Sequence, residues 1–434
     1  MKQPQSTAAT PFTAYQKLLI GILALLQFTV ILDFMVLSPL SDILMKSLNV
    51  TPAQFGWVVS VYAFSAGGSG LLAAGFADKF DRKKLLVFFY AGFILGTFGC
   101  AMATSYHLLL AARVVTGLFG GVIGAISMAV VTDIFELNQR GRVMGVLQMG
   151  FAGSQVLGIP IGLYFANLWG WHAPFLMIVG LAVLLMLVMV LKMQPVNKHL
   201  ALQSEKNAFL HLGHTVSNSR YQTGFLATAF LSVGGFMLMP FGSAYLINNI
   251  HISQHSLPMV FLCTGISSIV IMPFIGKLSD KLNKFHLFTG GSILAIIMIL
   301  IYTNLPPVPL WLVVVVNMIM FMGIMSRMIP ATTLNTGIPE MADRGAYMSI
   351  SSSLQQVAGG IGAVIAGLIV SQSGKGAPLQ HYGTLGIVVA AVITACIFFV
   401  YRVSVMVQNK QREVVNVAAA ENYDSIDEVL PEHL

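Results

Sequence analysis

A carboxylate and a guanidinium stand inside long apolar runs of this sequence. Asp33 is the only charged residue of VILDFMVLSPL (30–40), and Arg113 lies within HLLLAARVVTGLFGGVIG. Charged side chains are costly at bilayer depth and mark ion or substrate pathways. Burial favours the neutral form of a carboxyl group, which makes Asp33 a candidate for proton coupling or substrate contact. The alternative is a permanent ion pair with Arg113 that ties two helices together and keeps Asp33 charged.

The two charges are expected at similar depths in the bilayer. If the first apolar run crosses outward, Asp33 lies nine residues before Asp42 at its outer end, or roughly 13 Å below it. The run that carries Arg113 returns inward from about His107, which places Arg113 roughly 9 Å below the same surface. These depths are similar enough for Asp33 and Arg113 to meet.

The composition indicates that membrane-spanning helices position these charges. Of 434 residues, 56% are hydrophobic and only 9% are charged, whereas a soluble domain carries roughly 25% charged residues. The apolar runs are of helical length and lack the alternation of barrel strands. No HExxH, GxSxG or Walker motif is present, so no enzymatic function is expected. No metal site is expected at the cysteines, which share no short spacing: Cys100, Cys263 and Cys396.

Twelve apolar runs are long enough for a bilayer, which needs roughly 20 residues. They fall at 17–41, 53–76, 85–104, 107–134, 143–166, 172–192, 222–247, 257–276, 285–303, 308–331, 345–370 and 383–404. We therefore expect an all-α integral membrane fold with two six-helix halves. Its segments are a cytoplasmic N-terminal segment (1–16), a first bundle (17–192), a cytoplasmic linker (193–221), a second bundle (222–404) and a cytoplasmic acidic tail (405–434). The end of the tail, ENYDSIDEVLPEHL, is expected to be disordered.

Lys and Arg residues flank the runs unequally. With both termini in the cytoplasm, only Lys46 and Lys375 fall on the outer side, and Arg113 and Arg327 fall within spans. Cytoplasmic loops carry the excess of positive charge, so this orientation is expected. Basic loops that meet anionic headgroups also explain the net charge of +7, and no nucleic-acid partner is required.

The two halves of the sequence resemble each other. AGFADKFDRKK (74–84) aligns with GKLSDKLNKFH (276–286) at an offset of 202, and QRGRVMG aligns with DRGAYMS at an offset of 204. At the offset of 202, Asp33 falls on Gly235, so the charged pair belongs to one half only. A six-helix duplication of this kind predicts a binding site near mid-membrane, between the halves.

With these motifs in view, the chain resembles the major facilitator superfamily over residues 15–405, especially its twelve-helix drug–proton antiporters and sugar-efflux permeases. The loop AGFADKFDRK keeps the charges of the family pattern Gly-x-x-x-Asp-Arg/Lys-x-Gly-Arg/Lys-Arg/Lys, although Ala74 and Asp81 replace its glycines. Arg113 and Gly117 match the RxxxG pattern of helix 4. GIMSRMIPATTLNTGIPEMADRGAYMSISSSLQQ resembles helices 10 and 11 of the sugar-efflux permeases.

The resemblance implies roles for two further sets of residues. In the family, a loop Asp contacts the start of helix 11 and a loop Arg pairs with an acid that ends helix 4. The matching residues, expected to form a cytoplasmic latch unless they are simple topogenic charges, are Asp78, Arg82 and Asp133. The stretch GSQVLGIPIG resembles the antiporter motif of helix 5, and its matching residues are Gly153, Gly158, Pro160 and Gly162. In the family the motif has a Gly-Pro pair, whereas here Ile159 separates Gly158 from Pro160.

Polar and soft apolar side chains gather on the helices expected to border or support the cavity. Met-rich surfaces can repack around varied ligands, although helix packing also explains such residues. Arg327, three residues before Pro330, is expected either to bind an anionic substrate group or to hold a broken backbone. The candidates are Gln27, Phe34, Met35, Gln148, Gln155, Phe236, Met237, Met239, Asn317, Arg327, Gln355 and Gln356.

These features predict a secondary transporter that exports a small amphipathic or apolar compound in exchange for protons, driven by the proton gradient and without a cofactor. The alternative is uptake of a nutrient, siderophore or lipid by symport or facilitated diffusion. A non-transporting receptor or an intramembrane enzyme has no supporting motif. We expect a monomer in the lipid bilayer of a bacterial inner membrane, with a small-molecule substrate and both termini in the cytoplasm.

Overall fold

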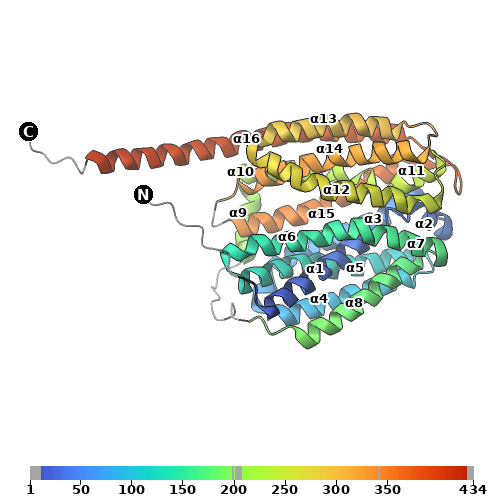
Figure 1. Ribbon diagram of the computed structural model, residues 1–434, viewed down its shortest axis with the longest axis horizontal. Coiled ribbons are helices and arrows are strands. Elements are labelled where there is room, and N and C mark those ends of the chain that lie inside the picture. The colour runs from blue at the N-terminus through green and yellow to red at the C-terminus, as the bar shows by residue number, and fades with distance from the viewer. Residues whose placement is uncertain (1–10, 198–199, 201–207, 341–342, 428–434) are drawn as a thin grey trace, which may run out of the picture.

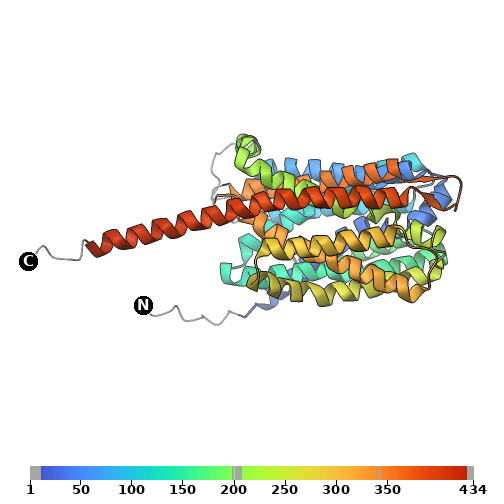
Figure 2. The same ribbon diagram turned by 90° about the horizontal axis from the view of Figure 1, so that it is seen from above.

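The helices of the protein run side by side in one elongated bundle. The structure, a computed structural model, describes residues 11–197, 200, 208–340 and 343–427. Figures 1 and 2 show the long helices along a common axis, with both ends of the described chain on the same side of the bundle. We call this side the terminal end. The opposite side, where the short helices α2 (Ser41–Leu48) and α11 (Gly242–Asn248) lie, is the distal end.

The first half of the chain forms the lower part of the bundle in Figure 1. A short 3-10 turn, η1, connects the second span to the third. A π-helical segment, η2, interrupts the fifth span. The elements are α1 (Ala14–Val36), α2, α3 (Pro52–Phe76), η1 (Ala77–Lys79), α4 (Arg82–Ala101), α5 (Tyr106–Ile134), α6 (Leu137–Gly153), η2 (Ser154–Gly158), α7 (Ile159–Trp169) and α8 (His172–Lys192).

The second half repeats this arrangement, with the helix α9 before its first span and a hairpin before its last span. Strands β1 and β2 pair antiparallel, with Ser371 opposite Gln380. The elements are α9 (Ala208–Ser217), α10 (Ser219–Phe236), η4 (Met239–Phe241), α11, η5 (Gln254–Ser256), α12 (Leu257–Lys281), α13 (Lys284–Thr303), α14 (Leu310–Thr336), α15 (Arg344–Ile369), β1 (Ser371–Gln372), β2 (Leu379–Gln380) and α16 (Tyr382–Asp427).

The twelve-helix membrane fold expected from the sequence is confirmed. Eleven described helices are long and apolar enough to cross a membrane. The twelfth span is the continuous run of α6, η2 and α7, whose pieces are each shorter than a full crossing. Pro160 at the start of α7 explains the break, because its ring has no N–H and displaces the carbonyl one turn earlier. The widened π turn accommodates that displacement.

The structure adds one helix to the linker and corrects one local expectation. The linker segment 193–221 contains the helix α9. The end of the tail, predicted to be disordered from residue 421, is helical up to Asp427, where α16 ends. A helix that is already formed extends at little cost, and residues 405–427 contain no proline or glycine to stop it. Figure 1 shows this part of α16 projecting beyond the bundle.

Local sequence signals set where the first helices begin. Thr13 caps α1 by accepting a hydrogen bond from the Gln16 N–H, and the Gln16 side chain accepts from the Thr13 N–H in return. Thr51 and Gln54 form the same reciprocal box at α3, with Pro52 in the first turn. Each box satisfies two backbone donors that a helix start would otherwise leave unpaired.

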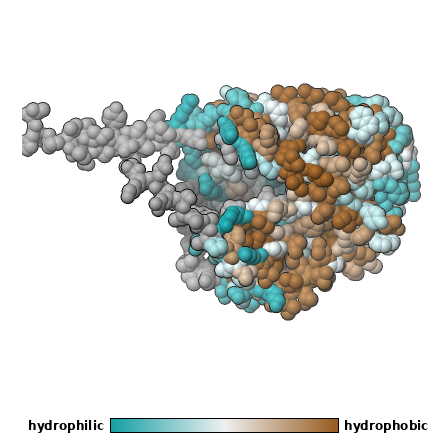
Figure 3. All heavy atoms as spheres, in the orientation of Figure 1, coloured by the Kyte–Doolittle hydropathy of each residue, from teal (hydrophilic) through white to brown (hydrophobic). Residues whose placement is uncertain are grey.

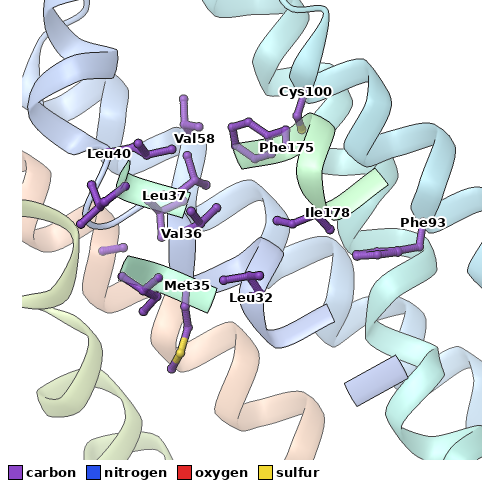
Figure 4. Close-up of a cluster of buried hydrophobic side chains, with 14 of the residues drawn as sticks. Leu32, Met35, Val36, Leu37, Leu40, Val58, Phe93, Cys100, Phe175 and Ile178 are labelled. Carbon is purple, nitrogen blue, oxygen red and sulfur yellow. The ribbon is translucent and has the colours of Figure 1, made fainter. Parts of the chain in front are cut away.

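The distal half of α1 is enclosed by apolar side chains of the first half. Figure 4 shows Leu32, Val36 and Leu37 among Phe93 and Cys100 of α4 and Phe175 and Ile178 of α8. Every one of these side chains is buried. This packing fixes the rotation of α1 and therefore the direction in which Asp33 points.

The outer surface of the bundle is apolar around its middle. Figure 3 shows a hydrophobic band flanked by hydrophilic residues at the terminal and distal ends. Large apolar side chains point outward, for example Leu95 (68% exposed), Val270 (67%) and Leu368 (70%). Lipid tails cover such a band, because they are as apolar as these side chains. The protein is therefore a multi-pass membrane protein.

The two halves meet mainly along two helix pairs, α3 with α15 and η2–α7 with α12. Glycines bring the first pair close. A Cβ on Gly56 would lie 2.8 Å from the Ala363 carbonyl oxygen, and one on Gly67 would lie 2.8 Å from the Ser353 carbonyl oxygen. Ser60 Oγ also donates to the Gly360 carbonyl oxygen at 2.8 Å. Close backbone approach through small residues is how membrane helices gain packing energy.

Replacing Gly67 with Val should destabilise this arrangement of the halves. The new side chain would overlap Ser353 and Val357 of α15, and overpacking of this kind costs about 1–3 kcal/mol. We expect a lower Tm of the detergent-purified protein. Gly68→Val is the matched control, because a Cβ there meets nothing within 4 Å. An equal loss of Tm in both variants would contradict the assigned interface.

Candidate functional site

Asp33 and Arg113 form a fully buried ion pair inside the first half. Arg113 Nη1 lies 2.7 Å from Asp33 Oδ2, and neither side chain is exposed (0% each). The other carboxylate oxygen, Oδ1, accepts a hydrogen bond from Thr97 Oγ1 at 3.2 Å. The structure thus brings the two charges together, and through them joins α1 to α5 and α4. Their part in proton coupling stays a prediction.

The rest of the Arg113 guanidinium is packed but incompletely hydrogen-bonded. Its Cζ lies 4.4 Å from the centroid of the Tyr62 ring on α3, a cation–π contact. Within the part of the chain that the structure describes, Nε and Nη2 have no hydrogen-bond partner. Removing one member of a buried ion pair costs about 3–5 kcal/mol, because the other charge is left uncompensated. The pair is therefore both a structural tie and a site where a change of charge has a large effect.

Thr97 and Tyr62 complete this site and were not among the residues singled out from the sequence. Thr97 lies in the apolar run FFYAGFILGTFGCAM, where a threonine hydroxyl would ordinarily bond to its own helix backbone. Tyr62 is an aromatic residue in a membrane helix, and no spacing relates it to Arg113. Only the packing of α3 and α4 against α1 and α5 shows that these side chains contact the charges.

The glycines of the helix-5 motif face α1. A Cβ on Gly158 would lie 2.6 Å from Leu32 Cδ1, and one on Gly162 would lie 3.3 Å from Val36 Cγ2. Gly153 precedes the π segment and Pro160 follows it, near the start of α7. The motif therefore lets the broken fifth span pack directly against the helix that carries Asp33. On its other side, a Cβ on Gly265 of α12 would lie 2.8 Å from Val156 Cγ2, so η2 also touches the second half.

Two of the three latch residues form an ion pair at the terminal end. Arg82 Nε lies 3.2 Å from Asp133 Oδ2, and Arg82 Nη1 donates to the Ala77 carbonyl oxygen at 2.9 Å. This pair joins the start of α4 to the end of α5 within the first half. The side chain of Asp78 lies outside the described residues, so the contact expected between it and α15 stays a prediction.

Half of the cavity candidates remain accessible to some extent. Phe34 of α1 and Phe236 of α10 contact each other across the two halves, with ring centroids 5.7 Å apart, and Phe34 also lies 5.2 Å from Tyr62. Phe34 and Phe236 are related by the same offset of 202 that aligns the repeats. The partly buried candidates are Gln27, Phe34, Phe236, Met239, Gln355 and Gln356.

The other described candidates are buried in this conformation. Gln155 Nε2 lies 3.9 Å from Met35 Sδ, which links η2 to α1. Asn317 Nδ2 donates to Thr264 Oγ1 at 2.7 Å and links α14 to α12. Met237 is 0% exposed. The side chain of Gln148 lies outside the described residues.

Arg327 is buried in the second half, and no carboxylate of the described residues pairs with it. It is 1% exposed, and its Cζ lies 5.7 Å from the centroid of the Phe288 ring on α13. Among the described residues, Nε and Nη2 have no hydrogen-bond partner. A cation–π contact gives about 0.5–2 kcal/mol, whereas burying a charge costs several kcal/mol. The aromatic contact alone therefore does not compensate for the burial. The helix continues through Pro330 to Thr336, so the backbone there is not broken.

Polar contacts between the halves gather at the distal end, and we call them the distal clasp. Asn248 Nδ2 donates to Asp42 Oδ1 at 2.6 Å, and Asp42 Oδ2 pairs with Lys46 at 2.8 Å. Ser38 Oγ donates to the Met239 carbonyl oxygen. A second contact between the halves lies at the same end, where Gln254 Nε2 donates to Asn167 Oδ1 at 2.9 Å. Figure 3 shows the surface hollowed between the halves at the opposite, terminal end.

Comparisons with known proteins agree with this architecture. The model of the Major Facilitator Superfamily matches residues 23–342 and 224–423. The uncharacterized MFS-type transporter YceJ of Bacillus subtilis is 26% identical over 371 residues, covering 82% of this chain and 89% of the relative. A probable sugar efflux transporter of Helicobacter pylori is 29% identical over 157 residues, covering 36% of this chain and 40% of the relative.

A solved structure has the same fold. It is that of a bacterial homolog of the human lysosomal transporter Spinster, in an inward-facing and unoccupied conformation. The TM-score is 0.73 at 14% identity, and the match covers 92% of this chain and 99% of that one. With the family model matched across most of the sequence and the two six-helix halves in place, the chain belongs to the Major Facilitator Superfamily and is a membrane transporter, not an enzyme.

Proposed function

We propose that the protein exports a small amphipathic or apolar compound in exchange for protons, by alternating access of a central site to the two sides of a bacterial inner membrane. The observation that carries this proposal is the buried Asp33–Arg113 pair with its Thr97 and Tyr62 contacts. No other described carboxylate is buried at the middle of a span.

The pair has the parts that coupling requires. A proton on Asp33 would cancel its charge and leave Arg113 without its counter-charge, which alters the electrostatic energy of the first half by several kcal/mol. Such a change is large enough to bias an equilibrium between two arrangements of the halves, since about 5.5 kcal/mol moves a two-state population from 1:99 to 99:1. Proton binding on Asp33 is therefore able to drive the conformational cycle.

The arrangement of contacts supports an orientation and a state. With both termini in the cytoplasm, the distal clasp closes the outer side and the hollow of Figure 3 opens inward. This orientation keeps the basic residues in the cytoplasm. Asp33 is fully buried in this state, so loading it with a proton from outside requires that the clasp open. The protein works as a monomer, since each chain holds both halves.

The partly buried side chains between the halves indicate the class of substrate. Phe34, Phe236 and Met239 offer apolar and aromatic surface, and three amides lie on the same set of helices, namely Gln27, Gln355 and Gln356. An apolar surface with a few polar groups suits a neutral, amphipathic compound. The relative described as a probable sugar efflux transporter supports export. Uptake is the alternative, and the direction of proton-driven flux separates the two.

Asp33→Asn should abolish proton-driven transport while the chain still folds. Compounds that raise the Tm of the purified protein are first selected from a panel of sugars and amphipathic drugs, because a bound ligand stabilises by mass action. Everted vesicles acidified by respiration should then accumulate a selected compound with the native protein and lose this accumulation with Asp33→Asn. Asp81→Asn is the matched control, since an asparagine still caps α4.

Removing both charges tests the structural alternative. If the pair only ties α1 to α5, Asp33→Asn with Arg113→Gln should restore proton-driven accumulation, because no buried charge is left unpaired. If Asp33 carries the proton, the double variant stays uncoupled although its Tm recovers. Accumulation of substrate only when the lumen is alkaline would instead favour proton-coupled uptake.

Asn248→Ala should favour opening of the distal end. Its amide donates across the halves to the Asp42 carboxylate, and a hydrogen bond to a charged group is worth about 1.5–3 kcal/mol. Spin labels at Leu48→Cys and His251→Cys report the separation of the halves, and we expect a larger population at long distance. Asn249→Ala is the matched control, because the Asn249 side chain bonds to the backbone of Leu379, within the second half. Equal opening in both variants would refute the clasp.

A further inference from the structure

The transport mechanism above does not use the buried guanidinium of Arg327 in the second half. This guanidinium points among α10, α13 and α16, where a Cβ on Gly234 would lie 3.9 Å from Arg327 Nη1. The side chain is 1% exposed. Cys396 interacts with the guanidinium through its charge and a side-chain hydrogen bond, and no carboxylate of the described residues interacts with it. A positive charge in an apolar interior needs a compensating negative charge.

A second unpaired donor lies on the neighbouring helix α13. Gly291 brings α13 against α14, since a Cβ there would lie 3.2 Å from the Arg327 backbone nitrogen. Phe288, which contacts the guanidinium, and Ser292 are one helical turn apart on the same face of α13. Ser292 is 0% exposed, and its Oγ has no hydrogen-bond partner among the described residues. Arg327 Nε and Nη2 likewise are buried and have no hydrogen-bond partner among the described residues.

We propose that this cluster binds a small monovalent anion inside the second half. The guanidinium supplies one positive charge and the N–H groups of Nε and Nη2, and Ser292 supplies a hydroxyl donor. One negative charge neutralises the site, whereas a divalent anion would leave an excess charge in apolar surroundings made by Phe288, Val392 and Ile393. The enclosed position favours a small ion such as chloride. The site does not depend on proton coupling at Asp33, which lies in the other half.

The test measures stabilisation of the detergent-purified full chain by anions at constant ionic strength and constant sodium. Tm is recorded as chloride, acetate or sulfate replaces gluconate. We expect a saturable rise of Tm with chloride, because an ion that binds only the folded state stabilises it. If acetate raises Tm and chloride does not, the natural occupant of the same site is a carboxylate. Sulfate should have no such effect.

Two variants decide whether the stabilisation arises at this cluster. Arg327→Met removes the unpaired charge and should make Tm independent of the anion. Ser292→Ala keeps the fold and should raise the half-saturating chloride concentration several-fold. Ser127→Ala is the matched control, since Ser127 is an equally buried serine whose Oγ lacks a partner in the described residues of the first half. A chloride effect that is absent in the native protein, or unchanged in Arg327→Met and Ser292→Ala, would overturn the proposal.

Discussion

The hydrocarbon of a bilayer offers no water to a polar group, and this constraint governs the whole molecule. Backbone N–H and C=O groups are satisfied within helices, so every crossing of this chain is helical. Several hydroxyl groups inside the spans donate to carbonyl oxygens of their own helix, as Thr116 and Ser65 do. Charges have no such local solution, because their partners must come from another helix. The few buried charges therefore determine which helices must stay together.

The two halves meet this constraint in different ways. In the first half, the Asp33 carboxylate pairs with Arg113 and accepts a hydrogen bond from Thr97, which links three helices. In the second half, the position aligned with Asp33 is Gly235, where a Cβ would meet nothing within 4 Å, and Arg327 lies at a different place on its helix. Duplication thus preserved the fold, while the polar chemistry diverged. We infer that such asymmetry separates proton coupling in one half from anion binding in the other.

The halves are joined by one closely packed interface and one weaker interface. Glycines on α3 and small residues on α15 allow the two backbones to touch, and this close contact leaves no room for an added side chain. The distal clasp, in contrast, consists of a few hydrogen bonds and one network around Asp42. Interactions of that size can be broken by a substrate or a proton, since each is worth a few kcal/mol at most. Rocking of the halves about the helix pairs is thereby made possible without unfolding either one.

The sequence by itself determined the membrane class, the twelve spans and the presence of buried charges, because these depend on composition and on the length of apolar runs. It also indicated that Asp33 and Arg113 lie at similar depth. Only the tertiary structure decided that Thr97 and Tyr62 complete their site and that Arg327 has no acidic partner in the described chain. Hydropathy specifies how deep a residue lies in the membrane. The direction in which its side chain points, and what it meets there, depend on how each helix is rotated and packed against its neighbours.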